Sequence, residues 1–418
     1  MTPARRIKAV LTGAVLGAML ILVWGASELA AQSPTSSRPL KVFVLAGQSN
    51  MQGHAHVRTF EVIGLDAKTA PMLKDMCTAD GTPRVCENVW ISSIGSADEE
   101  QVGKLTAGFG AKAGGPKIGP EFTFGIYMQK LLDEPILIVK TAWGGKSLHT
   151  DFRPPSAGPY VFNEAQLKQF AQQGKDLEQA KADKAQATGR CYRLMIEHVK
   201  NVMADIRRVW PDYDPARGYE LAGFVWFQGW NDMVDGSAYP NRGKPGGYDL
   251  YSDLLAQFIR DVRKDLSAPK LPFVIGVMGA GGPVDLYSPE QQRYRDIHQS
   301  FRMAMAAPAE LEAFKGSVVA VPTEKYWDME LVALRAKDAK IQQELRKLQE
   351  AGTLSREEQN AALEKRRAEV FTPREMVILE KGVSNFEFHY LGSAKIMAQI
   401  GKGFAEAMFE VMDGQRRR

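Results

Sequence analysis

A serine near the start of the sequence and a histidine near its end have the placement of a nucleophile and its base. Ser49 stands in the run Gly47-Gln48-Ser49-Asn50-Met51, directly after a short apolar segment. A tight turn after a buried strand can project a serine hydroxyl into a cleft, where a histidine can remove its proton. His389 comes just before a C-terminal helical segment. Each feature is weak by itself, because most such serines cap turns and most single histidines are structural.

Two further blocks of glycines and polar residues follow apolar segments. Gly144 and Gly145 come after the run 135–141, and paired glycines let backbone N–H groups approach a ligand, as an oxyanion hole requires. The block at 227–232 supplies side-chain amides that could donate to an oxyanion and a carboxylate that could orient a histidine. Its polar residues are Gln228, Asn231 and Asp232. Plain turns would explain both blocks as well.

The elements that must position these residues are short buried strands that alternate with amphipathic helices. Helical periodicity appears over 193–209 and 251–266. Such alternation predicts an α/β fold with three layers, α/β/α, in which helices cover both faces of a mostly parallel sheet of about five strands. Ligands of such sheets bind at the carboxyl ends of the strands, where the three blocks lie. The expected strands are 39–46, 135–141, 222–227, 272–278 and 317–321.

Two stretches depart from this alternation. Residues 329–370 are dense in Glu, Lys, Arg, Gln and Ala, and Ser355 to Glu358 form a capping-box sequence. They are expected to form a charged helical hairpin inserted between the first part of the domain, 40–328, and its C-terminal part, 371–418. The stretch 57–119 is irregular and is expected to be loops.

The N-terminus has the pattern of an export signal. A positively charged start precedes the apolar run 9–26, and small residues follow at 29–31. This predicts a cleaved signal peptide over 1–31, a flexible linker over 32–39 and a secreted or periplasmic protein. The alternative is that 9–26 remains as a membrane anchor. No other stretch is long and apolar enough to span a membrane.

Charge and cysteine content restrict the partners. The formal net charge of +4 over 418 residues gives no reason to expect nucleic-acid binding. Export would permit oxidation, so a bridge between Cys77 and Cys86 that leaves out Cys191 is expected. The alternative is that all three cysteines are unpaired small hydrophobic residues. His54 and His56 form a His-x-His pair without an evident third ligand, so no metal site is expected.

Taken in order, the blocks resemble those of the SGNH hydrolases, in particular the sialate O-acetylesterase and acetylxylan-esterase-like branch. The first family block, Gly-Gln-Ser-Asn-Met, is matched in full by 47–51, and Thr-Ala-x-Gly-Gly is matched by 141–145. The third block, Gln-Gly-Glu, is matched only at Gln228 and Gly229. The resemblance covers roughly 40–407 apart from the hairpin.

The resemblance implies a serine esterase that removes acetyl groups from carbohydrate without a metal or organic cofactor, and the N-terminal pattern implies that this esterase is exported. Ser49 would be the nucleophile and His389 the base. The oxyanion hole would use the amides of Ser49 and Gly145 with the side chain of Gln228 or Asn231. Substrate contacts are expected from Gln48, Asn50, Trp143, Gly144 and Trp230.

The triad acid is where the sequence departs from the family. Trp230 replaces the usual Glu after Gln-Gly, and Phe386 stands three residues before His389, where Asp is frequent. Asp232 is the expected substitute, and Glu387 is the alternative. A Ser–His dyad is a further alternative. The missing acids also leave open a non-catalytic carbohydrate-binding protein on the same scaffold, and a lipase-like or aryl esterase.

Overall fold

The computed structural model describes residues 38–96 and 99–417. The predicted signal peptide, and the linker up to residue 37, lie outside the described residues. From Arg38 onward the chain forms one compact unit. Within residues 38–96 and 99–417, no helix has the length and apolar composition needed to cross a membrane.

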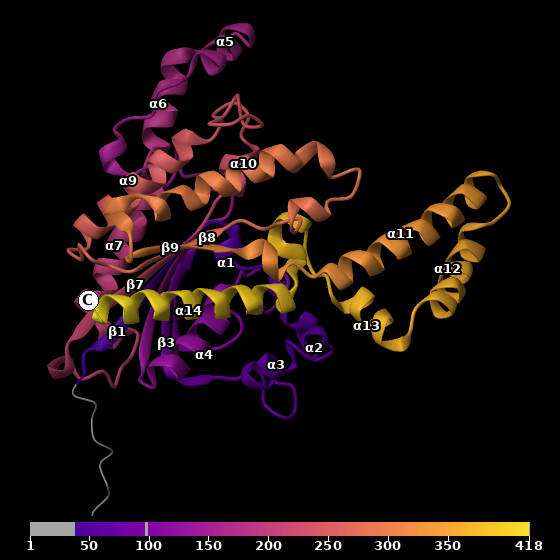
Figure 1. Cartoon of the computed structure of the whole chain (residues 1–418), viewed down its shortest axis with the longest axis horizontal. Coiled ribbons are helices and arrows are strands. Elements are labelled where there is room, and N and C mark those ends of the chain that lie inside the picture. The colour runs from indigo at the N-terminus through magenta and orange to yellow at the C-terminus, as the bar shows by residue number, and fades with distance from the viewer. Residues whose placement is uncertain (1–37, 97–98, 418) are drawn as a thin grey trace, which may run out of the picture. The chain divides into compact units, whose positions relative to one another are not determined.

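A seven-stranded sheet forms the centre of this unit (Figure 1). Its strands are parallel except β4, which pairs antiparallel with β3. Every residue of β1 and β6 is buried, so both faces of the central strands are covered. In spatial order the strands are β4 (Gln101–Leu105), β3 (Cys86–Gly95), β6 (Ile136–Ala142), β1 (Leu40–Gly47), β7 (Tyr219–Phe227), β8 (Phe273–Val277) and β9 (Val318–Pro322).

The α/β class and the mostly parallel sheet are confirmed, but the expected strand number was too low. Both additional strands, β3 and β4, come from the stretch 57–119 that was predicted to be loops. They lie at one edge of the sheet, and several of their residues are partly exposed. An edge strand needs no continuous apolar run, so a search for such runs misses it. The same stretch also contains β5 (Lys117–Ile118), which pairs with β2 (Ala55–His56).

Helices pack against the sheet at several places. α14 (Ala394–Arg416), in yellow in Figure 1, packs on α4 (Pro120–Leu132) and contacts β7, β8 and β9. α10 (Arg295–Ala306) also contacts β8 and β9. The other helices of the domain are α1 (Ser49–Gln52), α2 (Phe60–Ile63), α3 (Ala70–Met76), α5 (Glu164–Gln172), α6 (Leu177–Ala187), α7 (Arg190–Ala204), α8 (Trp230–Val234) and α9 (Asp249–Asp265).

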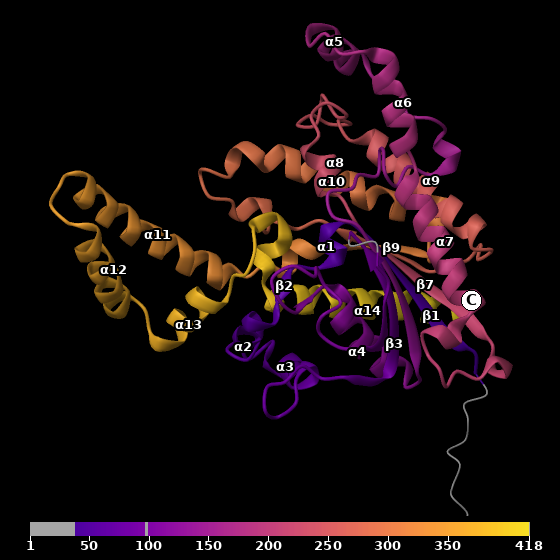
Figure 2. The same cartoon turned by 180° about the vertical axis from the view of Figure 1, so that it is seen from behind.

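Two long helices occupy the charged stretch 329–370. α11 (Met329–Glu350) and α12 (Arg356–Val370) pack on each other and extend away from the sheet, as Figures 1 and 2 show. Arg367 of α12 makes two hydrogen bonds of 2.7 and 2.8 Å to the carboxylate of Asp338 in α11. The shorter α13 (Pro373–Lys381) then leads back to the sheet domain.

The expected bridge between Cys77 and Cys86 is not present. The segment between them closes through backbone hydrogen bonds instead, including Arg84 N to Met76 O at 2.8 Å. Burial raises the pKa of the Cys86 thiol to about 11 and also raises the pKa of Cys77, so both remain protonated at neutral pH. The reading of these two residues as unpaired hydrophobic side chains fits the structure.

Candidate active site

Ser49 lies at the carboxyl end of β1, in the first position of α1. Only glycine fits at position 47, because a Cβ on Gly47 would lie 2.2 Å from the carbonyl oxygen of Phe227 in β7. Strand β1 can therefore end against β7 and turn at once into α1. The amide N–H of Ser49 is the first of this short helix and has no acceptor within it.

The loop after β6 passes beside Ser49. A Cβ built on Gly144 would lie 3.9 Å from the Cβ of Ser49 and 3.3 Å from Oε1 of Gln52. Gly145 has a φ of +73°, a left-handed conformation that favours glycine. Among the described residues, the N–H of Gly145 has no hydrogen-bond partner, whereas that of Gly144 donates to Ser96 Oγ at 2.8 Å. The structure thus brings Gly145 and Ser49 to the same end of the sheet, each with an unused amide.

His389 reaches this end of the sheet from the other end of the sequence. It belongs to the 3-10 segment η10 (Glu387–Gly392), which packs against both α1 and β2. Nδ1 of His389 lies 2.8 Å from Oδ1 of Asn385, so this ring nitrogen donates its proton to the amide oxygen. Nε2 is then left as the unprotonated, basic nitrogen. In the part of the chain that the structure describes, no hydrogen bond joins Ser49 Oγ to His389.

A second histidine lies flat on His389. The rings of His54 and His389 are stacked, with their centroids 3.8 Å apart and their planes within 2° of parallel. Burial lowers the pKa of His389 to about 4. The pKa of His54 is lowered to about 3, by burial and then by the charges of His389, Lys117 and Lys140. Both imidazoles are therefore neutral at neutral pH.

The backbone after His389 takes an uncommon course. Tyr390 and Leu391 have φ values of +53° and +60°, so two consecutive residues with side chains adopt the left-handed conformation. Tyr390 is fully buried, and its hydroxyl accepts a hydrogen bond from the Gly279 amide at 2.8 Å and lies 2.7 Å from Thr323 Oγ1. Such strain persists only where the surroundings hold it, and it collects at active sites. Here the strained residues directly follow His389, whose ring is held by Asn385 and His54.

Asp232, the expected triad acid, is not a partner of His389. Its carboxylate is fully buried and accepts four hydrogen bonds of 2.6–3.0 Å. The donors are the backbone N–H groups of Leu148 and His149, the side-chain amide of Gln228 and the hydroxyl of Tyr239. The Asp232 carboxylate therefore joins the loop after β6 to the loop after β7. Its four hydrogen-bond donors all belong to these loops and hold them together.

Glu387, the alternative acid, is also not bonded to His389. It is exposed, and one carboxylate oxygen accepts a hydrogen bond of 3.3 Å from Nε2 of Gln291. In an extended segment, residues two apart share a face, but 387–392 is a 3-10 turn, so that relation does not hold. The residue that does reach Nδ1 is Asn385, four positions before His389. An Asn at this spacing is the sequence signal that was overlooked.

Two of the expected amide groups are used inside the protein. Gln48 is buried, and its Oε1 accepts hydrogen bonds from the N–H groups of Gly229 and Asn231 and from Gln228. The side-chain nitrogen of Gln228 also donates to Asp232 and to the carbonyl of Lys146. Gln48 and Gln228 therefore join the three loops at the sheet edge. The side chain of Asn231 makes no hydrogen bond to any described residue, so its amide remains available to a ligand.

The remaining expected substrate contacts differ in their surroundings. Trp143 is buried and packs on Phe152 with ring centroids 5.9 Å apart, which is a core position. Asn50 is also buried, and among the described residues its Oδ1 has no hydrogen-bond partner. Trp230 is only partly buried and packs on Phe388, next to His389, at 5.4 Å. Trp230 thus borders the site through its contact with Phe388, whereas Trp143 belongs to the core.

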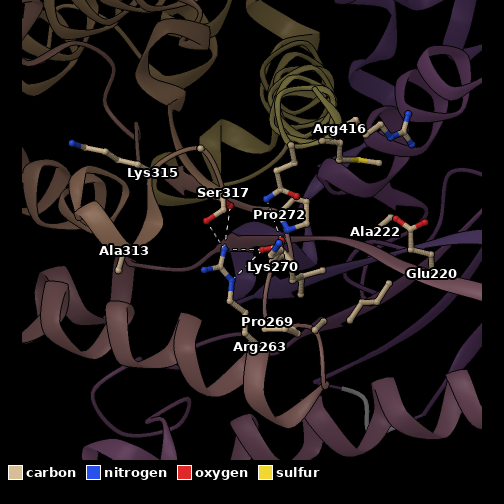
Figure 3. Close-up of a pocket in the computed structure, with 16 residues that line it drawn as sticks. Glu220, Ala222, Arg263, Pro269, Lys270, Pro272, Ala313, Lys315, Ser317 and Arg416 are labelled. Carbon is tan, nitrogen blue, oxygen red and sulfur yellow. Dashed lines mark hydrogen bonds between the residues drawn. The ribbon is translucent and has the colours of Figure 1, made fainter. Parts of the chain in front are cut away.

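A further cavity lies away from these residues. A cavity of about 800 Å³ opens at the amino ends of the strands, where residues before β8 and β9 line it (Figure 3). Arg263 crosses its wall and donates hydrogen bonds to Leu271 O at 2.8 Å and to Ser317 Oγ at 2.9 Å. None of the expected site residues lines it. In sheets of this kind the chemistry takes place at the carboxyl ends, so this cavity is not the catalytic cleft.

Metal ligands do not gather at the site. Over residues 38–96 and 99–417, no group of three or more His, Cys, Asp or Glu side chains has a geometry that could hold a metal ion. His56, the second member of the His-x-His pair, accepts a hydrogen bond of 3.0 Å from the Arg58 amide through Nδ1. His54 faces His389 instead of a shared ligand.

Comparison with known proteins gives one family match and several similar structures. The family described as SASA, a carbohydrate esterase and sialic acid-specific acetylesterase, matches residues 39–314. A protein from Arabidopsis thaliana is 15% identical, with a TM-score of 0.34 over 68% of this chain and 86% of that one. A carbohydrate acetylesterase from Xanthomonas citri is also 15% identical, with a TM-score of 0.35 over 67% of this chain and 49% of that one. No curated protein matches the chain.

Proposed function

Since this chain belongs to the sialic acid-specific acetylesterase family of carbohydrate esterases, we propose that it removes O-acetyl groups from carbohydrates through an acyl-enzyme formed on Ser49. Membership makes the protein a carboxylic ester hydrolase. The observation that carries the mechanism is that η10 packs on α1 with the Nδ1 proton of His389 held by Asn385. The basic Nε2 is thereby left for the serine.

The reaction proceeds in two balanced steps. His389 Nε2 takes the proton of the Ser49 hydroxyl as the oxygen attacks the acetyl carbonyl, and the resulting imidazolium gives that proton to the departing sugar oxygen. The bond between the acetyl carbonyl carbon and the sugar oxygen breaks, and the acetyl group is held as an ester on Ser49. Water then repeats the sequence, with His389 as its base, and releases acetate.

The oxyanion of each tetrahedral intermediate is held by donors that the folded chain leaves unused. These are the amides of Ser49 and Gly145, with the side-chain amide of Asn231 as a third donor. Asn231 takes the place of Gln228 as the side-chain donor, because the N–H groups of Gln228 already have acceptors inside the protein. Gly144 contributes by the absence of a side chain, which lets the loop backbone pass close to Ser49.

Asn385 takes the position of the triad acid, so the third member is neutral. Its amide oxygen can hold the His389 ring in one tautomer and one orientation. It stabilises the positive charge of the imidazolium less than a carboxylate would. The neutral ring of His54 covers one face of that imidazolium.

The family is one of sialic acid-specific acetylesterases, and this favours acetylated carbohydrate as the substrate over a lipid or an aryl ester. The direct test is acetate release from a panel of O-acetylated sialic acids and polysaccharides, with Ser49→Ala measured beside the wild type. Acetate released by the wild type alone supports the proposal. Turnover of long-chain or aryl esters without any acetylated sugar would favour a lipase-like or aryl esterase, and binding without turnover of any ester would favour a carbohydrate-binding protein.

Two broader features belong to the same proposal. The sheet with its covering helices forms the three-layer α/β/α domain of the SGNH hydrolases, which is supported by the complete burial of β1 and β6. The protein is exported, which is supported by the charged start and apolar run of the first 31 residues. Mass spectrometry of the native protein should find a terminus near Gln32, whereas an intact Met1 or Thr2 terminus would favour the anchor.

The pH dependence of the reaction should report the unusual environment of His389. The base must be neutral to accept a proton, and burial lowers its pKa to about 4. We therefore expect kcat/KM to stay level from neutral pH down to about pH 5 and to fall below about pH 4. In Asn385→Asp, a carboxylate beside Nδ1 favours the imidazolium, so the fall should begin at a higher pH than in the wild type.

Asn385→Leu supplies the matched control for this profile, because it removes the hydrogen bond without adding a charge. It should lower kcat more than it changes KM, and it should leave the acid limb at or below the wild-type position. Wild-type activity that already falls near the ordinary histidine pKa of about 6.5 would show that His389 is not the buried base described here.

A further inference from the structure

A partly open aromatic pocket lies beside Phe388, the neighbour of His389, and has no part in the acyl-transfer steps above. Its volume is about 360 Å³, within the range of roughly 300–1,000 Å³ that is usual for small-molecule sites. It is walled by residues that follow the carboxyl ends of β7 and β8 and by the segment before His389. Its aromatic lining is formed by Trp230, Tyr287, Tyr294 and Phe388.

The pocket is separated from the catalytic base by one side chain. The ring of Phe388 lies 4.4 Å from the ring of His389, at 66° to it. Trp230 packs on the same phenylalanine at 5.4 Å. A ligand in the pocket would therefore touch the phenylalanine that contacts the imidazole.

The chemistry of the reaction places one part of the ester on the histidine side. The imidazolium must reach the leaving oxygen to protonate it, whereas the carbonyl oxygen points to the amides of Ser49 and Gly145. Resting on the function proposed above, we propose that this pocket is the leaving-group subsite, and that it binds the sugar ring whose O-acetyl group is removed or the sugar ring next to it. We refer to it as the leaving-group pocket.

The lining of the pocket fits a sugar better than a fully apolar chain. Aromatic faces pack on the C–H faces of a pyranose, and charged side chains bond its hydroxyls. The pocket offers both, because Arg242 and Glu387 line it together with the aromatic residues. Two of its apolar residues are openly exposed, Val234 at 45% and Tyr294 at 41%. Exposed apolar groups gathered around a cavity mark a binding surface.

The test compares two acetate esters that differ only in their alcohol. The first is a methyl glycoside carrying one O-acetyl group, and the second is methyl acetate, whose methanol is too small to fill the leaving-group pocket. In Tyr294→Ala, we expect the ratio of kcat/KM for the glycoside to kcat/KM for methyl acetate to fall about tenfold, which corresponds to about 1.4 kcal/mol. Val234→Trp, which narrows the pocket, should lower the same ratio.

Tyr219→Ala is the matched control, because Tyr219 is 45% exposed and lies at the other end of β7. Its ratio should equal that of the wild type. The proposal is overturned if the ratio is unchanged in both pocket variants while Ser49→Ala is inactive, a result that leaves the esterase function intact. It is also overturned if these variants change the preference between acetyl and butyryl esters of one sugar, because the pocket would then hold the acyl chain. Full activity in Ser49→Ala would instead refute the esterase mechanism itself.

Discussion

Ser49→Ala should lower the rate of acetate release by on the order of 10⁴- to 10⁶-fold, with the fold unchanged. Ser49 begins the helix α1, which contacts η10 and lies beside Gly144 in the loop after β6, so its hydroxyl is the proposed nucleophile. The side chain is nearly buried and accepts only a long contact of 3.5 Å from Gln48, so its removal costs the fold little. Circular dichroism and thermal unfolding should match those of the wild type.

His389→Ala should lose activity to a similar extent, because the serine hydroxyl is a weak nucleophile without its base. Residues that act as one unit give effects that do not add, so the double variant should be little worse than either single variant. Ser156→Ala, at an exposed serine, is the matched control and should keep wild-type turnover. Activity in Ser49→Ala within tenfold of the wild type would exclude the serine mechanism.

Asp232→Asn should lower the free energy of unfolding by about 3–6 kcal/mol, because two hydrogen bonds to a buried charged group are lost where the amide nitrogen faces existing donors. All four near neighbours of this carboxylate are donors, and two of them are backbone N–H groups that cannot turn away. Denaturant titration measures this loss. The exposed Glu387→Gln is the matched control and should change stability by no more than about 0.5 kcal/mol.

The same variant separates the two roles that Asp232 could have. If it ties the loops together, the activity of the folded Asp232→Asn protein should fall only as far as the loops move, and the acid limb of kcat/KM should stay at the wild-type pH. If it were the triad acid, the loss would be about four orders of magnitude with little change in stability. That second pattern would contradict the geometry seen here.

Short stretches of sequence predict much of the candidate site. The apolar runs that form β1, β6, β7, β8 and β9 predicted parallel strands, because strands covered on both faces need continuous apolar residues. Of these, β9 lies at the edge of the sheet and is only partly buried. A polar block directly after each strand must then lie at the carboxyl edge of the sheet. This reasoning was sufficient to place Ser49, the paired glycines and the 227–232 block together, and the family follows from the same blocks.

The partner of His389 was decided only by the tertiary structure. Asp232 and Glu387 were chosen by their spacing, but a carboxylate acts only where its lone pairs are free and its direction is right. The fold surrounds Asp232 with structural donors and turns Glu387 to solvent, while the 3-10 turn and two left-handed residues bring Asn385 to Nδ1. Contacts between residues remote in sequence, such as the stack of His54 on His389, leave no local pattern, because they depend on how the whole chain packs.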